Sequence, residues 1–74
     1  MNENTSLPER LARLAVGRAT LLQALASAQA CGDRKFIDDN RYAREEYDNE
    51  IESLKAMATE AELQEAANIT NARI

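Results

Sequence analysis

The residues best suited to binding chemistry gather in one short stretch of this chain, residues 34–47. All three aromatic side chains, Phe36, Tyr42 and Tyr47, fall there together with Arg34, Arg41 and Arg44. Tyr presents a rigid ring with a polar tip, and Arg presents a forked donor set that also stacks on rings. Such pairs are enriched at protein interfaces, and they also suit nucleotides. The stretch therefore predicts a recognition surface.

Helical spacing divides these aromatic residues between two faces. Phe36 and Tyr47 share one face and are expected to pack inside, whereas Tyr42 points elsewhere. We therefore expect Tyr42 to be the main contact for a partner. The full set of residues predicted to bind a partner is Tyr42, Arg34, Arg41, Arg44, Arg10 and Arg13.

Arg18 interrupts an apolar stripe, because it stands between Leu14 and Leu21 where an apolar residue is expected. In a structural interpretation, its stem lies along a helix seam and its guanidinium pairs with Glu45 or Glu46. In a functional interpretation, Arg18 and Tyr47 bind an anionic nucleotide at a subunit junction, and the neighbouring Gly17 leaves room for it. Both interpretations stay open.

Catalysis and metal binding find little support in the residue types. The chain has no His and one Cys, so it lacks the ligands of a usual zinc site and the bases of nucleophilic catalysis. It also lacks a Gly-rich phosphate loop. We expect a protein that is not an enzyme and holds no metal or cofactor. The unpaired Cys31, the polar N-terminus and the absence of a long apolar run favour the cytoplasm and no membrane contact.

Charge is uneven along the chain, whose net charge is −4. Residues 1–31 carry three basic and two acidic residues, whereas residues 32–74 carry six basic and eleven acidic ones. Duplex DNA is therefore an unlikely partner, because phosphate contacts need a basic footprint. The acidic half could instead face a basic patch on a partner protein, or mimic a nucleic-acid backbone.

A first helix is expected over about residues 7–30. Ser6 can cap it, Pro8 suits its first turn, and Glu9 would complete a capping box. Gly32 suits the left-handed residue that follows a helix. The apolar residues recur at steps of three and four: Leu7, Leu11, Leu14, Leu21, Leu25 and Ala28.

A second helix is expected over about residues 33–57, with Asp33 as its cap and Asn40 on its inward face. Matched lengths joined by a tight turn predict an antiparallel helical hairpin. Thr59 and Glu62 form another capping box. Either the second helix continues through this box, or a short third helix begins there and covers about residues 60–72.

Association is expected because 74 residues without a disulfide or metal rarely build a sufficient core. We predict one all-α domain over residues 1–74, with a flexible arm at 1–6 and an end that frays over 69–74 unless it docks. Two or more copies would form a four-helix bundle, or a higher oligomer, with coiled-coil-like seams. The predicted oligomer core is Leu11, Leu14, Leu21, Leu25, Phe36, Ile51 and Leu54.

In size, acidity and lack of catalytic residues, the chain resembles the small helical proteins with which bacteriophages block host proteins or sequester host nucleotides. The resemblance rests on architecture, so it transfers no functional residue. It implies an accessory protein that inhibits or sequesters a host macromolecule, most simply a host protein. The alternatives are an oligomeric sponge for a nucleotide second messenger, and a structural or assembly adaptor.

Overall fold

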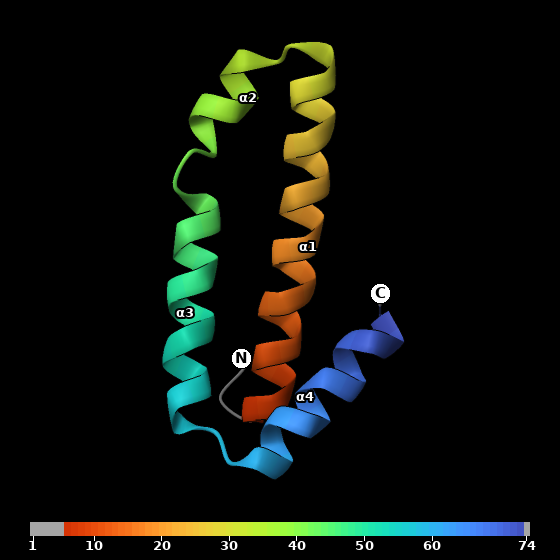
Figure 1. The fold of residues 1–74 in the computed structure, drawn as a ribbon, viewed down its shortest axis with the longest axis vertical. Helices are drawn as coiled ribbons and strands as arrows, with labels where there is room; N and C mark the ends of the chain where they lie inside the picture. The colour runs from red at the N-terminus through yellow and green to blue at the C-terminus, as the bar shows by residue number, and fades with distance from the viewer. Residues whose placement is uncertain (1–5, 74) are drawn as a thin grey trace.

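The computed structural model describes residues 6–73, and within that range the chain forms helices and short connections without a strand. The helices are α1 (Leu7–Cys31), α2 (Arg34–Asp39), α3 (Ala43–Met57) and α4 (Glu60–Arg73). After α1 the chain reverses, α2 and α3 return beside it, and α4 turns back across its first half (Figure 1). The prediction of an all-α fold is confirmed. Residues 1–5 of the expected arm, and Ile74, lie outside the described residues.

Local capping defines both ends of α1. The Ser6 hydroxyl accepts a hydrogen bond from the Glu9 amide at 3.3 Å, as expected of a cap. The Glu9 carboxylate, however, binds Arg73 of α4 instead of completing the capping box. At the other end, Gly32 adopts φ 73°, and the Asp33 amide donates to the Ala28 carbonyl at 2.8 Å. This left-handed turn ends α1 close to the predicted residue.

The expected continuous helix over residues 33–57 is wrong, because the chain leaves helical geometry between Asp39 and Ala43. Asn40 is the residue at which α2 ends. Its backbone amide and its side-chain amide both donate to the Phe36 carbonyl, at 3.1 and 2.9 Å, and the next amide, of Arg41, turns to the Asp38 carbonyl at 3.3 Å. Three residues, 40–42, then form a turn before α3 begins. Asn40 is half-buried, as a residue of the inward face would be, but it ends a helix instead of continuing one.

The two possibilities at Thr59 are resolved in favour of a new helix. The Glu62 amide donates to the Thr59 hydroxyl at 3.2 Å, and the Thr59 amide donates to the Glu62 carboxylate at 2.9 Å. This reciprocal box starts α4, and Ala58 before it is extended. Residues 69–73 were expected to fray unless they dock, and here α4 remains helical to Arg73, which binds Glu9 of α1.

The hydrophobic core lies at the end of the molecule where α1, α3 and α4 meet. Leu11, Leu54 and Ala66, one from each helix, form its centre. Around them pack the half-buried residues Leu7, Leu14, Ile51, Ala58 and Leu63. In the described part of the chain no large side chain is completely buried. A single copy therefore buries its apolar side chains only in part.

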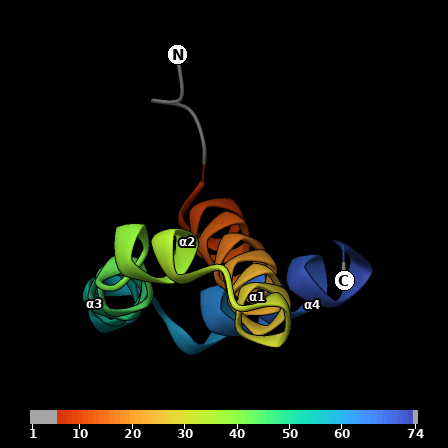
Figure 2. The same cartoon turned by 90° about the horizontal axis from the view of Figure 1, so that it is seen from above.

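The other half of α1 is more thinly covered. There α1 packs against α2, and α4 lies away from it toward the opposite end (Figures 1 and 2). Leu21, Leu25 and Phe36, all expected in an oligomer core, are only partly buried. Across residues 6–73, none of the helices has both the length and the apolar character needed to cross a bilayer.

Candidate functional site

Tyr42 stands out from the surface at the turn between α2 and α3. Its side chain is 64% exposed, so the prediction that it points away from the packed face is confirmed. The Arg41 guanidinium carbon lies 5.7 Å from the centre of the Tyr42 ring. A cation over an aromatic face at this distance contributes about 0.5–1 kcal/mol at an exposed site.

The neighbouring arginines are free to bind. Arg34, Arg41 and Arg44 are all exposed, and none forms an ion pair with any residue in the range 6–73. Spacing of four residues would pair Arg44 with Asp48, but Asp48 binds Arg18 instead. We call Tyr42, Arg34, Arg41 and Arg44 the Tyr42 surface. Its cations keep their hydrogen-bonding capacity for another molecule.

Arg10 and Arg13 do not join this surface. Both are exposed on the first half of α1. The contact between Gly17 and Tyr47 shows which positions of α1 and α3 lie side by side. Tyr42 precedes Tyr47 by five residues on the returning chain. At 1.5 Å per residue, Arg13 therefore lies ~13 Å along the helix axis from the level of Tyr42. The sequence-based set is split into two separate groups.

Arg18 has a partner, but not the predicted one. Its Nε donates to the Asp48 carboxylate at 2.6 Å, and both side chains are partly exposed. The expected partners, Glu45 and Glu46, lie elsewhere on α3. The pair lines a hollow of about 690 Å³ whose other walls come from α1, α3 and α4. The structural interpretation of Arg18 thus has a direct contact to support it.

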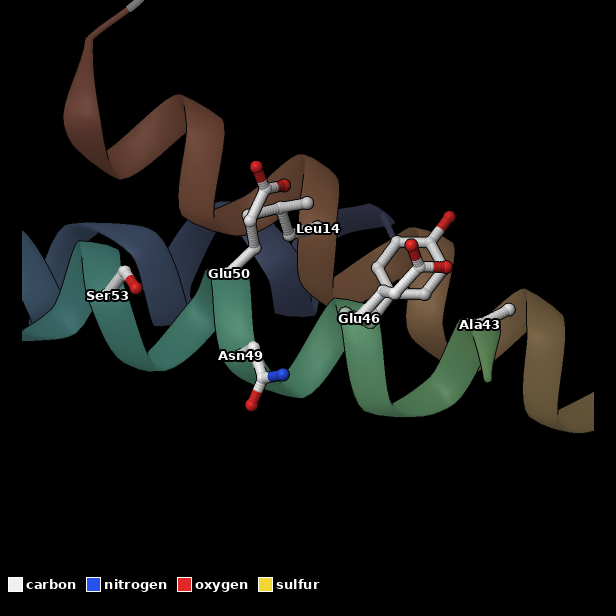
Figure 3. Close-up of a pocket in the computed structure, with 7 residues that line it drawn as sticks. Leu14, Ala43, Glu46, Asn49, Glu50 and Ser53 are labelled. Carbon is white, nitrogen blue, oxygen red and sulfur yellow. The ribbon is translucent and has the colours of Figure 1, made fainter. Parts of the chain in front are cut away.

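Tyr47 lines a different hollow. This second one measures about 550 Å³ and is formed by α1 and α3, with Leu14 in its floor and Glu46 and Glu50 beside it (Figure 3). The space beside Gly17 is filled by the Tyr47 ring, since a Cβ at position 17 would lie 3.0 Å from a ring carbon. Arg18 and Tyr47 therefore do not form one intramolecular ligand site.

An ion pair joins the two ends of the described chain, and the sequence did not predict it. Arg73 of α4 binds Glu9 of α1 through two contacts, at 2.6 and 3.0 Å. The hydrogen bond from Arg73 lowers the pKa of Glu9, against partial desolvation, and the charges of Arg73 and Arg13 lower it further. No local signal could reveal a pairing across 64 positions.

Comparisons with protein-family models, with curated proteins and with solved structures found no match to this chain. Sequence reasoning also missed Met57, the last residue of α3, which is 66% exposed. It matches Tyr42 in exposure but lacks neighbouring free arginines, so it offers a natural control.

Proposed function

We propose that this protein is a small, non-enzymatic binding protein that inhibits or sequesters a host macromolecule, in the manner of a bacteriophage accessory factor. The Tyr42 surface is the part that makes contact. One observation carries the proposal: a large ring that is 64% exposed has the Arg41 guanidinium 5.7 Å from its centre, and Arg41, like Arg34 and Arg44 on the adjoining helices, has no ion-pair partner among residues 6–73. Tyr and Arg are the residues that most often dominate binding energy at protein interfaces.

The chemistry of the surface defines the partner that fits it. The Tyr42 ring needs an apolar pocket with a hydrogen-bond partner for the hydroxyl, and the guanidinium groups need carboxylates. A folded host protein with acidic residues around a shallow pocket supplies both. The turn that carries Tyr42 is closed by a hydrogen bond from the Ala43 amide to the Asn40 carbonyl at 3.2 Å, which restrains it before binding. Restraint of this kind reduces the entropy lost on association.

Three variants test the proposal by affinity capture from a lysate of bacterial host cells. Tyr42→Ala removes the ring, Met57→Ala removes an equally exposed side chain elsewhere, and Arg41→Gln removes the stacked cation. We expect one partner that wild type and Met57→Ala retain equally and that the other two variants lose. With the purified partner, Tyr42→Ala should weaken binding at least ~10-fold. Equal capture by all the variants contradicts the proposal.

The alternative of a nucleotide sponge has less support. Its two candidate residues, Arg18 and Tyr47, line separate hollows, and Arg18 already pairs with Asp48. A sponge would need the site to be assembled between copies of the chain. Thermal melting with cyclic nucleotides distinguishes the two proposals, because a bound ligand raises the melting temperature by mass action.

A further inference from the structure

One side of the helix pair α1 and α3 is not covered by α4, and the residues on that side indicate what kind of partner would cover it. The hollow that holds Arg18 is walled by α4, whereas the hollow beside Tyr47 is lined by α1 and α3 alone. Viewed from above, α3 and α4 lie on different sides of α1 (Figure 2). We call the open side the α1–α3 face, defined by Leu14, Gly17, Leu21, Ala43, Tyr47 and Glu50.

This face suits packing against another pair of helices. Leu14, Leu21 and Tyr47 are partly buried, so each keeps apolar area that another surface could cover. Ala43 is small and lines the hollow on this face, so it leaves room for a neighbouring helix. α1 has 25 residues and is ~37 Å long. α3 has 15 residues and is ~22 Å long, so the two helices, each ~10 Å wide, give a footprint of ~600 Å². This is about three quarters of the ~800 Å² per partner that a dimer of standard size buries.

Charge on the two edges of the face is complementary. On α1, helical spacing places the exposed Arg13 one turn from Gly17 at the edge of the face, and on α3 the exposed Glu46 and Glu50 line the hollow. Neither Arg13 nor Glu50 has an ion-pair partner among residues 6–73. A two-fold axis parallel to the helices would place α1 of each copy opposite α3 of the other. Basic and acidic edges would then meet twice, once on each side of the axis.

The register of α1 against α3 determines which two charged residues would meet across the two-fold axis. Gly17 lies level with Tyr47, and Arg18 with Asp48, so α1 and α3 are aligned near these positions. Because α3 runs back along α1, Arg13 lies about two residues, or ~3 Å, from the level of Glu50. A rotation about an axis along the helices preserves these levels. Arg13 therefore comes within reach of Glu50 of the partner subunit.

From these relationships we propose that a second copy of this chain covers the α1–α3 face, forming a two-fold dimer in which Arg13 pairs with Glu50 of the partner subunit. The four packed helices are α1 and α3 of both copies. This inference is independent of the Tyr42 surface, because it uses other residues and predicts self-association instead of host binding. Each proposal can therefore fail without the other.

A charge exchange tests the dimer. Sedimentation equilibrium over a range of concentrations measures the dimer dissociation constant for wild type, Arg13→Glu, Glu50→Arg and the double variant. Glu65→Arg on α4 is the matched control, because it is exposed and carries the same charge change. Far-UV circular dichroism verifies that each variant folds, which is needed because Arg13 also acts on Glu9.

We expect wild type to reach twice the 8.2 kDa chain mass at micromolar concentration. Each single reversal should raise the dissociation constant by about 10–100-fold, since it places like charges together at two symmetric positions. The double variant should return to within a few-fold of wild type, and Glu65→Arg should stay unchanged. A wild-type monomer, a dimer insensitive to both reversals, or single losses that the double variant does not restore would each overturn the proposal.

Discussion

The Tyr47 ring lies directly over Gly17, and a Cβ at position 17 would stand 2.7 Å from the Tyr47 hydroxyl oxygen. The absent side chain of one helix thus provides the space for an aromatic residue of another. Gly weakens a helix interior by roughly 0.5–1 kcal/mol relative to Ala, so this site sacrifices local helix stability for the contact between α1 and α3. The contact also sets the register on which the dimer proposal depends.

Replacing Gly17 by Ala should have opposite effects in two backgrounds. In wild type, the new methyl group displaces the Tyr47 ring, so we expect Gly17→Ala to be neutral or destabilising. In Tyr47→Ala, nothing occupies that space, and the same change should stabilise the protein by about 0.5–1 kcal/mol through helix propensity. Urea unfolding of the four proteins at one concentration measures the coupling. If Gly17→Ala changed the free energy of unfolding equally in both backgrounds, the placement of the Tyr47 ring would not depend on the missing side chain at Gly17.

The Arg18–Asp48 pair should contribute modestly to stability. Both side chains remain partly exposed, so a double-mutant cycle with Arg18→Gln and Asp48→Asn should give a coupling energy of about 0.2–1 kcal/mol. The coupling should shrink as salt is added, because exposed charges are screened. A matched cycle with Arg18→Gln and Glu45→Gln should give no coupling. Coupling to Glu45 instead of Asp48 would contradict the observed register.

The capping box of α4 should respond to loss of its hydroxyl. Thr59→Ala removes the acceptor of the Glu62 amide, and caps of this kind are typically worth ~1 kcal/mol. Thr20→Ala is the control, because the Thr20 hydroxyl bonds to the Val16 carbonyl inside α1, where Ala is the better helix former. Denaturant unfolding should show a loss for Thr59→Ala and a small gain for Thr20→Ala. Similar losses for both would argue against a helix start at residue 60.

Acid should release the end of α4 from α1. Arg73 holds the pKa of Glu9 below its ordinary value of 4.5, so the folded state favours the carboxylate. The stabilisation is present above the ordinary pKa and is lost as pH falls through the lowered one. Melting temperatures of wild type and Glu9→Gln should therefore differ at pH 7 and converge in acid. The exposed Glu65→Gln should show no such difference, and a constant Glu9→Gln difference across the range would contradict the assignment.

Local signals in the sequence were sufficient for most helix ends. The residues at Ser6, Gly32, Asp33 and Thr59 act on backbone groups within four positions, so their type and spacing reveal the caps. The turn after α2 was missed because Asn40 falls at helical spacing from Phe36. Spacing alone does not show that its amide bonds to the Phe36 carbonyl and ends the helix.

Contacts between distant helices were harder to predict. The pairing of Arg18 with Asp48, and of Arg73 with Glu9, depends on how α3 and α4 settle against α1. If α3 were shifted by two residues along α1, a different carboxylate would lie next to Arg18. The exposure of Tyr42 was predictable because it follows from helical periodicity near a turn. Its separation from Arg10 and Arg13 follows from the reversal of the chain at Gly32, which the sequence also indicated.

Site-specific photocrosslinking would show whether a host protein contacts Tyr42 itself. A photoreactive phenylalanine analogue replaces Tyr42 in one protein and the equally exposed Met57 in another, and both are irradiated in a bacterial host lysate. The account predicts that one host protein crosslinks at position 42 and not at position 57, and that Arg41→Gln with Arg44→Gln removes the product. Crosslinks of equal yield at both positions, or none at position 42, would contradict a recognition surface at Tyr42.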